Sequence, residues 1–217
     1  MNLNELLDAY RAYNTADQSA ATAAVFAREQ ALLKSRNWQA SALAVGQLAP
    51  DFALPDSPGG SVRLSDLLVD GPLVLKFYRG RWCPYCTLEL RAYQRILPDI
   101  KALGARLLAI SPQTETEIAM NRERDALQFQ MVTDPDNAIA REFGIAYDVE
   151  PDLRAMLEAG GLDFARVNDT VGWSLPLPAA YLIGRDRRIA WSFLDTDYRR
   201  RAEPAEIVRQ LKLLTGG

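Results

Sequence analysis

The sequence predicts an α/β fold with a central mixed sheet, helices on both faces of that sheet and a helical extension at the N-terminus. Three short apolar runs alternate with helical patterns, which is typical of a parallel βαβ core; they cover residues 73–78, 106–110 and 129–133. Two later runs around a five-residue turn predict an antiparallel hairpin at one edge, over Ala179–Ile183 and Ile189–Phe193. The first 40 residues carry helical patterns only.

The composition is that of a globular protein. Of 217 residues, 48% are hydrophobic and 24% are charged, and the net charge of −3 gives no sign of a nucleic-acid partner. No apolar run approaches the roughly 18 residues that a membrane span needs. Met1–Glu5 lacks the basic and apolar regions of a signal peptide. We therefore expect a cytoplasmic protein, where a cysteine pair is more often catalytic than structural.

The N-terminal extension is predicted to cover residues 1–44 and the redox domain residues 45–217. Leu3, Leu6, Leu7 and Tyr10 share one face of a helix, and Ala16–Arg36 is an alanine-rich helical pattern. This segment either forms a dimer arm or packs on its own domain.

The remaining elements follow in order. Two short strands at Ala49–Leu54 and Val62–Leu64 enclose a turn at Pro55–Gly60, and a helical turn covers Asp66–Val69. A helix from Thr87 to about Leu103 should be kinked by Pro98. Further helices are predicted over Thr114–Ala126, Ala140–Gly144 and Pro151–Ala159, an irregular stretch over residues 162–178, and a last helix from Pro204.

The only two cysteines, Cys83 and Cys86, stand between a predicted strand and a predicted helix. In this setting the Cys-x-x-Cys spacing predicts a redox dithiol that cycles between dithiol and disulfide. The helix N-terminus and the flanking Arg79 and Arg81 favour a thiolate, and Pro84 stiffens the first turn. Two buried structural cysteines are the alternative interpretation.

The absence of histidine excludes His-assisted catalysis and His metal ligands. Two cysteines cannot fill a four-coordinate zinc site within one chain, although two chains could pool four cysteines around zinc or an iron–sulfur cluster. We expect no metal and no cofactor, and the thiols themselves are the candidates for chemistry.

The chain resembles the peroxiredoxin-like branch of the alkyl hydroperoxide reductase / thiol-specific antioxidant family, within the thioredoxin fold. The resemblance extends over roughly residues 45 to 214 and implies a thioredoxin-like redox domain. Its motifs lie at residues 46–54, 77–86, 133–135, 143–144, 175–179 and 197–198.

Two alignments of the cysteine motif follow from this resemblance. Compared with a thioredoxin, Trp82-Cys83-x-x-Cys86 makes Cys83 the nucleophile and Cys86 the resolving cysteine, and Pro178 corresponds to the cis-proline that faces the dithiol. Compared with a peroxiredoxin, Cys86 is the peroxidatic cysteine and Glu89 matches a glutamate often found there. In that second alignment, Arg79 replaces a proline, Cys83 replaces a threonine, and Pro178 stands where an activating arginine is expected.

These observations predict a thiol-dependent oxidoreductase that reduces peroxides through Cys83 and Cys86. Four aromatic side chains either line the pocket around the sulfurs or belong to the core: Trp82, Tyr85, Trp173 and Tyr181. Reduction of protein disulfides is the alternative, and a non-enzymatic redox-sensing module that acts through the N-terminal helices is a third. The resemblance implies an external thiol reductant of the thioredoxin or glutaredoxin type. A homodimer is a further expectation, and no nucleic acid or membrane is expected as a partner.

Overall fold

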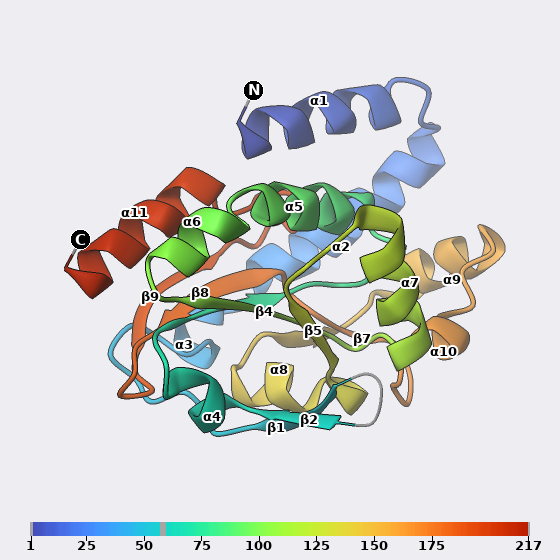
Figure 1. Ribbon diagram of the computed structural model, residues 1–217. Coiled ribbons are helices and arrows are strands. Elements are labelled where there is room, and N and C mark those ends of the chain that lie inside the picture. Colours follow the sequence, from blue (N-terminus) through green and yellow to red (C-terminus); the bar gives the residue numbers. More distant parts are fainter. Residues whose placement is uncertain (1, 57–59, 217) are drawn as a thin grey trace.

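A central seven-stranded mixed sheet organises the protein. The computed structural model describes residues 2–56 and 60–216. Helices cover both faces of the sheet, with α5, α6 and α11 above it and α8 below it in the view of Figure 1, as the sequence predicts. In spatial order the strands are β2 (Gly60–Arg63), β1 (Ala53–Asp56), β5 (Gln130–Thr133), β4 (Arg106–Ser111), β3 (Leu73–Phe77), β8 (Ala179–Ile183) and β9 (Ile189–Leu194).

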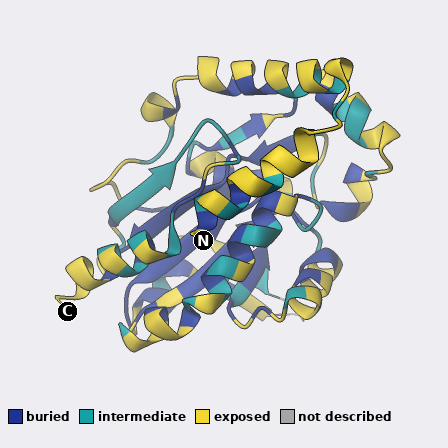
Figure 2. Cartoon of the chain, turned by 90° about the horizontal axis from the view of Figure 1, so that it is seen from above, coloured by how far each residue is buried: buried dark blue, intermediate teal, exposed yellow. Residues whose placement is uncertain are grey.

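Strand β3 is an interior strand of the sheet and leads directly to the cysteine motif. It pairs in parallel with β4 and antiparallel with β8, and all five of its residues are buried. Strand β8 in turn pairs antiparallel with β9, which confirms the predicted hairpin. The buried central strands contrast with the exposed outer faces of the surrounding helices (Figure 2), so the start of α5 follows a strand from the buried centre of the fold.

The helix after the cysteine motif is divided in two. Helix α5 (Pro84–Arg95) begins three residues earlier than predicted, at a proline that suits the first helical position. Backbone helicity breaks at Ile96 (φ −95°, ψ 3°), and α6 (Leu97–Ala102) follows with Pro98 in its first turn. The predicted effect of Pro98 is confirmed as a break rather than a bend. The other helices of the domain are α4 (Leu64–Leu68), α7 (Glu115–Asp125), the short 3₁₀ helix η1 (Pro135–Asn137), α8 (Ala138–Glu142), α9 (Pro151–Ala159), α10 (Phe164–Val167) and α11 (Pro204–Thr215).

The prediction of an irregular stretch over residues 162–178 is wrong in part. That stretch contains α10 and strand β7 (Ser174–Pro176), which pairs with β6 (Ala146–Asp148) in a second, two-stranded sheet. Elements of three or four residues are too short to show a period in the sequence. Strand β1 also begins later than predicted, at Ala53. The predicted turn at Pro55–Gly60 includes residues 57–59, which lie outside the described residues.

The N-terminal extension packs on its own domain. It forms α1 (Leu3–Thr15), α2 (Ala20–Ser35) and α3 (Trp38–Ser41), and α1 contacts α5 while α2 contacts α9. The carboxylate of Glu203 accepts hydrogen bonds from the first backbone N–H groups of α1, at 3.0 and 2.7 Å. Through its contact with α5, the extension covers the end of that helix that carries the cysteines (Figure 1). The homodimer and the domain boundary at residue 44 stay predictions.

Gly144 fixes the junction between this extension and the domain. Its φ is +69°, and a Cβ there would lie 1.7 Å from the carbonyl oxygen of Ser41. We expect Gly144→Ala to lower the free energy of unfolding by more than the roughly 1–3 kcal/mol of backbone strain alone. Chemical denaturation would measure this, with Gly161→Ala as the control, because Gly161 has φ +89° but open space around its Cβ position. Equal losses in the two variants would contradict the close approach at Ser41.

Candidate active site

The two cysteines occupy the first turn of α5. Cys83 is the N-cap residue, and Cys86 lies one turn further into the helix. The side chain of Cys86 is completely buried, Cys83 is 3% exposed, and both are free thiols. The apolar strand β3 and the apolar face of α5 bring this turn to the edge of the core, as the sequence predicts.

Two donors point at the sulfur of Cys86. The backbone N–H of Arg79 lies 3.4 Å from Sγ, and Nη2 of Arg201 lies 3.6 Å from it. Burial alone would raise the pKa of Cys86, but a hydrogen bond from the Cys83 thiol, the Arg201 guanidinium and the Arg79 N–H together hold the pKa well below its ordinary value. The helix N-terminus acts in the same direction. Cys86 is therefore the sulfur that the fold keeps as a thiolate.

Arg201 belongs to a buried network of charged side chains. Glu89 of α5 accepts a hydrogen bond from Nε of Arg201 at 2.7 Å and lies 2.7 Å from Nζ of Lys76 on β3. All three side chains are at most 1% exposed. Burial lowers the pKa of Lys76 and raises that of Glu89, while their mutual contact opposes both shifts. With all three ionised, the network carries one excess positive charge, which the Cys86 thiolate neutralises.

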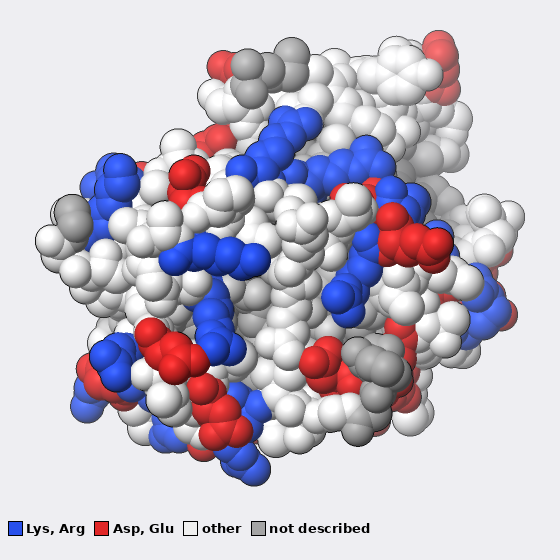
Figure 3. Space-filling model, viewed as in Figure 1, with Lys and Arg blue, Asp and Glu red and all other residues white. Residues whose placement is uncertain are grey.

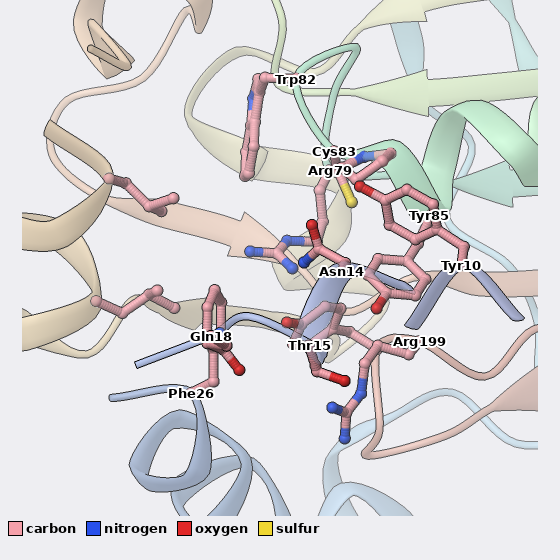
Figure 4. A pocket seen from close by; sticks show the side chains of 14 residues that line it. Tyr10, Asn14, Thr15, Gln18, Phe26, Arg79, Trp82, Cys83, Tyr85 and Arg199 are labelled. Carbon is pink, nitrogen blue, oxygen red and sulfur yellow. The ribbon is translucent and has the colours of Figure 1, made fainter. Parts of the chain in front are cut away.

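Cys83 lies on the other side of the pair and faces a cavity of about 220 Å³. Its sulfur points into this space, whereas Cys86 does not line it (Figure 4). The hydrogen bond to Cys86, followed by burial, raises the pKa of Cys83 well above its ordinary value. The pair thus consists of a buried thiolate and a neutral thiol that is open to the cavity.

Arg79 supplies buried positive charge in the cavity, and the second arginine that lines it, Arg199, is paired with Asp197 at 2.6 Å. Arg79 is 4% exposed, and its guanidinium lies over the rings of Tyr198 and Trp82, with centroid distances of 4.4 and 5.1 Å. Arg81 points away and pairs with Glu117 at 2.6 Å. Between them, Gly80 has φ +145°, and a Cβ there would lie 2.5 Å from Nε1 of Trp82. Only glycine at this position lets Trp82 reach the cavity wall.

Aromatic rings and the N-terminal helices complete the wall. The ring of Tyr85 meets Tyr10 of α1 edge-on at 5.3 Å and Tyr198 at 6.0 Å. Phe26 of α2 and the turn between α1 and α2 close the same cavity (Figure 4). The extension is therefore part of the site.

Most of the residues predicted from the sequence meet here. Trp82, Tyr85 and the exposed Pro84 line the cavity with Cys83 and Arg79, and Glu89 lies beneath Cys86. Pro178 is buried directly before β8, but it is not one of the cavity residues. Trp173 and Tyr181 do not line the cavity either, because Trp173 stacks on Phe164 and Tyr181 packs against Phe77 in the core. Sequence reasoning missed Lys76, Arg201 and the role of Tyr10.

Residues 2–56 and 60–216 contain no cluster of three or more His, Cys, Asp or Glu side chains that could hold a metal ion. In the same ranges, none of the helices has the length and apolar character to cross a membrane. Basic and acidic side chains are interspersed on the face shown in Figure 3.

The ionisation of Cys86 gives a pH prediction. We expect the ultraviolet thiolate absorbance of the reduced protein to persist well below pH 8.5, the approximate ordinary pKa of cysteine. A lowered pKa means that the thiolate is lost only as pH falls through that lowered value, and reactivity with electrophiles should fall with it. The absorbance should vanish from this range in Cys86→Ser but remain in Cys83→Ser. A midpoint at or above 8.5 in the reduced protein would contradict the assignment.

Known proteins share both the sequence family and the fold. The AhpC/TSA family model matches residues 45–192. Peroxiredoxin Bcp of Escherichia coli strain K12 is 30% identical over 103 residues, which is 48% of this chain and 65% of that protein. The chain thus spans about 65% of the length of the curated relatives it matches.

Solved structures agree with the predicted thioredoxin-like fold. Peroxidoxin BcpB from Mycobacterium tuberculosis superposes with a TM-score of 0.62 at 22% identity, covering 79% of this chain and 98% of that one. A variant of peroxiredoxin 6 from Arenicola marina superposes with a TM-score of 0.63 at 20% identity, covering 78% of this chain and 72% of that one. The N-terminal helices and Arg201 lie outside the family match.

Proposed function

This chain belongs to the AhpC/TSA family, and we propose that it reduces peroxides with Cys86 as the attacking thiolate and Cys83 as the resolving thiol. The observation behind this assignment is the pair of donors on the Cys86 sulfur, the Arg79 N–H and Arg201 Nη2. Both stabilise a thiolate, which is the reactive form of cysteine. The peroxidatic alignment therefore describes the electrostatics better than the thioredoxin alignment does.

The chemistry proceeds in two balanced steps. The Cys86 thiolate attacks one peroxide oxygen, the O–O bond breaks, and the leaving alkoxide or hydroxide takes a proton. Because its pKa is raised, the Cys83 thiol still holds its proton and can give it to this far more basic leaving group. The Cys83 thiolate so formed attacks the sulfenic acid on Cys86, which gives a disulfide and releases hydroxide, and the hydroxide takes a proton from solvent to become water.

Access to Cys86 requires one movement. Because Cys86 is completely buried and only Cys83 faces the cavity, the Cys83 side chain must turn aside before peroxide can reach the thiolate. The first helical turn contains both cysteines, so local opening of this turn would also let the two sulfurs bond. An external thiol must then restore the dithiol. We place this cycle in the cytoplasm, where such thiols are abundant.

Reduction of protein disulfides is the second candidate, because Cys83 is the sulfur that faces the cavity, as a thioredoxin nucleophile would. One assay separates the two functions. Reduced protein is mixed with equimolar hydrogen peroxide, and disulfide formation is followed by mass spectrometry. In parallel, reduction of insulin disulfides is measured with excess dithiothreitol. We expect rapid, stoichiometric peroxide consumption and little catalysis of insulin reduction, with the double serine variant as the blank. Fast insulin reduction without peroxide consumption would favour the second candidate.

A further inference from the structure

We infer that the cavity over Cys83 binds a small thiol that carries a carboxylate, and that this thiol is the reductant of the Cys83–Cys86 disulfide. The inference rests on the proposed function only in that it needs the disulfide to form. A protein reductant was the expectation from family resemblance. Three features indicate a small molecule instead: the cavity, a guanidinium in it that has no carboxylate partner among the described residues, and the unequal character of the two sulfurs.

Arg79 is the recognition element. Among the described residues it has no carboxylate as an ion-pair partner, and its Nε has no hydrogen-bond partner. The charge of Arg79 acts to lower the pKa of one nearby carboxyl group, Glu29 of α2. That carboxylate does not pair with Arg79 but accepts a hydrogen bond from the backbone N–H of Glu150 at 3.1 Å. The guanidinium points into the cavity beside Cys83 (Figure 4). A buried cation of this kind suits a planar anion, since guanidinium binds carboxylate with two parallel hydrogen bonds.

The cavity limits the size of its ligand. Its volume of about 220 Å³ lies below the roughly 300–1,000 Å³ of sites for drug-sized ligands. Tyr10, Phe26 and the turn between α1 and α2 form one wall, so a folded reductant would have to displace the extension to reach the sulfur. A thiol of a few carbons fits without such a change, with its stem against the rings of Trp82 and Tyr85.

The two sulfurs of the disulfide differ in accessibility and in pKa, and both differences direct the attack of a small thiolate to Cys83. Thiol–disulfide exchange is faster when the attacked sulfur is accessible and the thiol that leaves has a low pKa. Cys83 faces the cavity, and Cys86 leaves as a thiolate that Arg201 and the Arg79 N–H stabilise. The incoming thiolate bonds to Cys83 Sγ, and the Cys83–Cys86 bond breaks. A second small thiolate then attacks the ligand sulfur of the mixed disulfide, releasing a small-molecule disulfide and the Cys83 thiolate, which takes up a proton.

The test measures the reductive half-reaction alone. The protein is oxidised with diamide, so that the disulfide forms whether or not peroxide is a substrate. Its reduction is then timed with 3-mercaptopropionate, 2-mercaptoethanol and cysteamine, which are anionic, neutral and cationic. Each rate is divided by that of the same thiol with a small reference disulfide, which removes intrinsic thiol reactivity.

After this correction, we expect the anionic thiol to reduce the disulfide about tenfold faster than the neutral thiol, or more. A rate ratio of that size corresponds to the free energy of one charge-assisted hydrogen bond. In Arg79→Gln the ratio should fall to about one, whereas Arg81→Gln should keep the wild-type ratio because Arg81 points away to Glu117. Any effect of Arg79 on the leaving sulfur acts on all three thiols equally and cancels in the ratio.

Two outcomes would overturn the inference. One is equal corrected rates for the three thiols in the wild-type protein, which needs no variant to fold. The other is reduction by a thioredoxin-type protein that is much faster than by 3-mercaptopropionate and unchanged in Arg79→Gln. Peroxide consumption is measured separately, so a protein that ignores peroxide but prefers the anionic thiol would refute the proposed function and leave this inference standing.

Discussion

Cys86→Ser should lose its reaction with hydrogen peroxide, while Cys83→Ser should still consume a single equivalent of it. The fold keeps Cys86 as a thiolate through the Arg79 N–H and Arg201, and it raises the pKa of Cys83. Replacing Cys86 removes the hydrogen bond that is the largest cause of the raised pKa of Cys83, but burial still raises that pKa, and the hydrogen bonds of the Arg79 N–H and Arg201 Nη2 are made to the Cys86 sulfur. Because a hydrogen bond to a charged group contributes about 1.5–3 kcal/mol, the remaining cysteine in Cys86→Ser should react about ten- to hundredfold more slowly than Cys86 does in the wild-type protein.

The products distinguish the two roles. In Cys83→Ser the sulfenic acid on Cys86 has no resolving partner and should be trapped by dimedone, whereas the wild-type protein should give the internal disulfide and little adduct. Stopped-flow measurement of peroxide loss, with mass spectrometry of the adduct, covers both points. The reverse pattern, in which only Cys86→Ser reacts and is trapped at Cys83, would assign the nucleophile to Cys83 and support disulfide exchange.

The sequence predicts the scaffold of this site well because the scaffold depends on local patterns. Strand β3 is a continuous apolar run, the cysteines follow it at a helix start, and Pro84 marks the first helical position. Each of these signals lies within a few residues of the element it predicts. The placement of Cys83 and Cys86 on one helical turn follows from spacing alone.

Lys76 and Glu89 could have been recognised as a pair. A lysine in the middle of a buried apolar strand needs a partner, because an unpaired buried charge is costly. Glu89 lies on the face of α5 that packs against β3, one turn after Cys86, and the two meet at 2.7 Å. A charged residue inside an otherwise apolar strand is the sequence signal that indicates such a buried pair.

Arg201 and Tyr10 carry no such signal. Arg201 is the last of three consecutive arginines, and its neighbour Arg200 is exposed while Arg201 is buried. Which member of the run turns inward depends on how the segment after β9 crosses α5, and that is a tertiary contact over 112 residues of sequence separation. Tyr10 reaches Tyr85 only because α1 packs across α5. Such contacts depend on packing between distant segments rather than on local periodicity.

Arg201→Met should impair both the reactivity of Cys86 and the stability of the protein. The substitution removes a donor to the Cys86 sulfur and leaves Glu89 paired with Lys76 alone. Loss of a hydrogen bond to a charged group costs about 1.5–3 kcal/mol, which corresponds to a reduction in the peroxide rate of about ten- to hundredfold. Breaking a buried ion pair by removing one partner typically destabilises a protein by about 3–5 kcal/mol.

The pKa of Cys86 separates these two effects. Without the guanidinium its pKa should rise, so thiolate absorbance should be lost at a higher pH than in the wild-type protein. Arg200→Met is the matched control, because Arg200 is exposed and contributes only its backbone carbonyl to Arg201, at 2.9 Å. Arg201→Lys keeps the positive charge but loses the two-nitrogen fork that joins Glu89 to Cys86, so it should recover part of the pKa shift. If Arg201→Met folds and titrates like the wild-type protein, the Cys86 thiolate owes its stability to the Cys83 hydrogen bond, the Arg79 N–H and the helix N-terminus, and Arg201 has no part in activation.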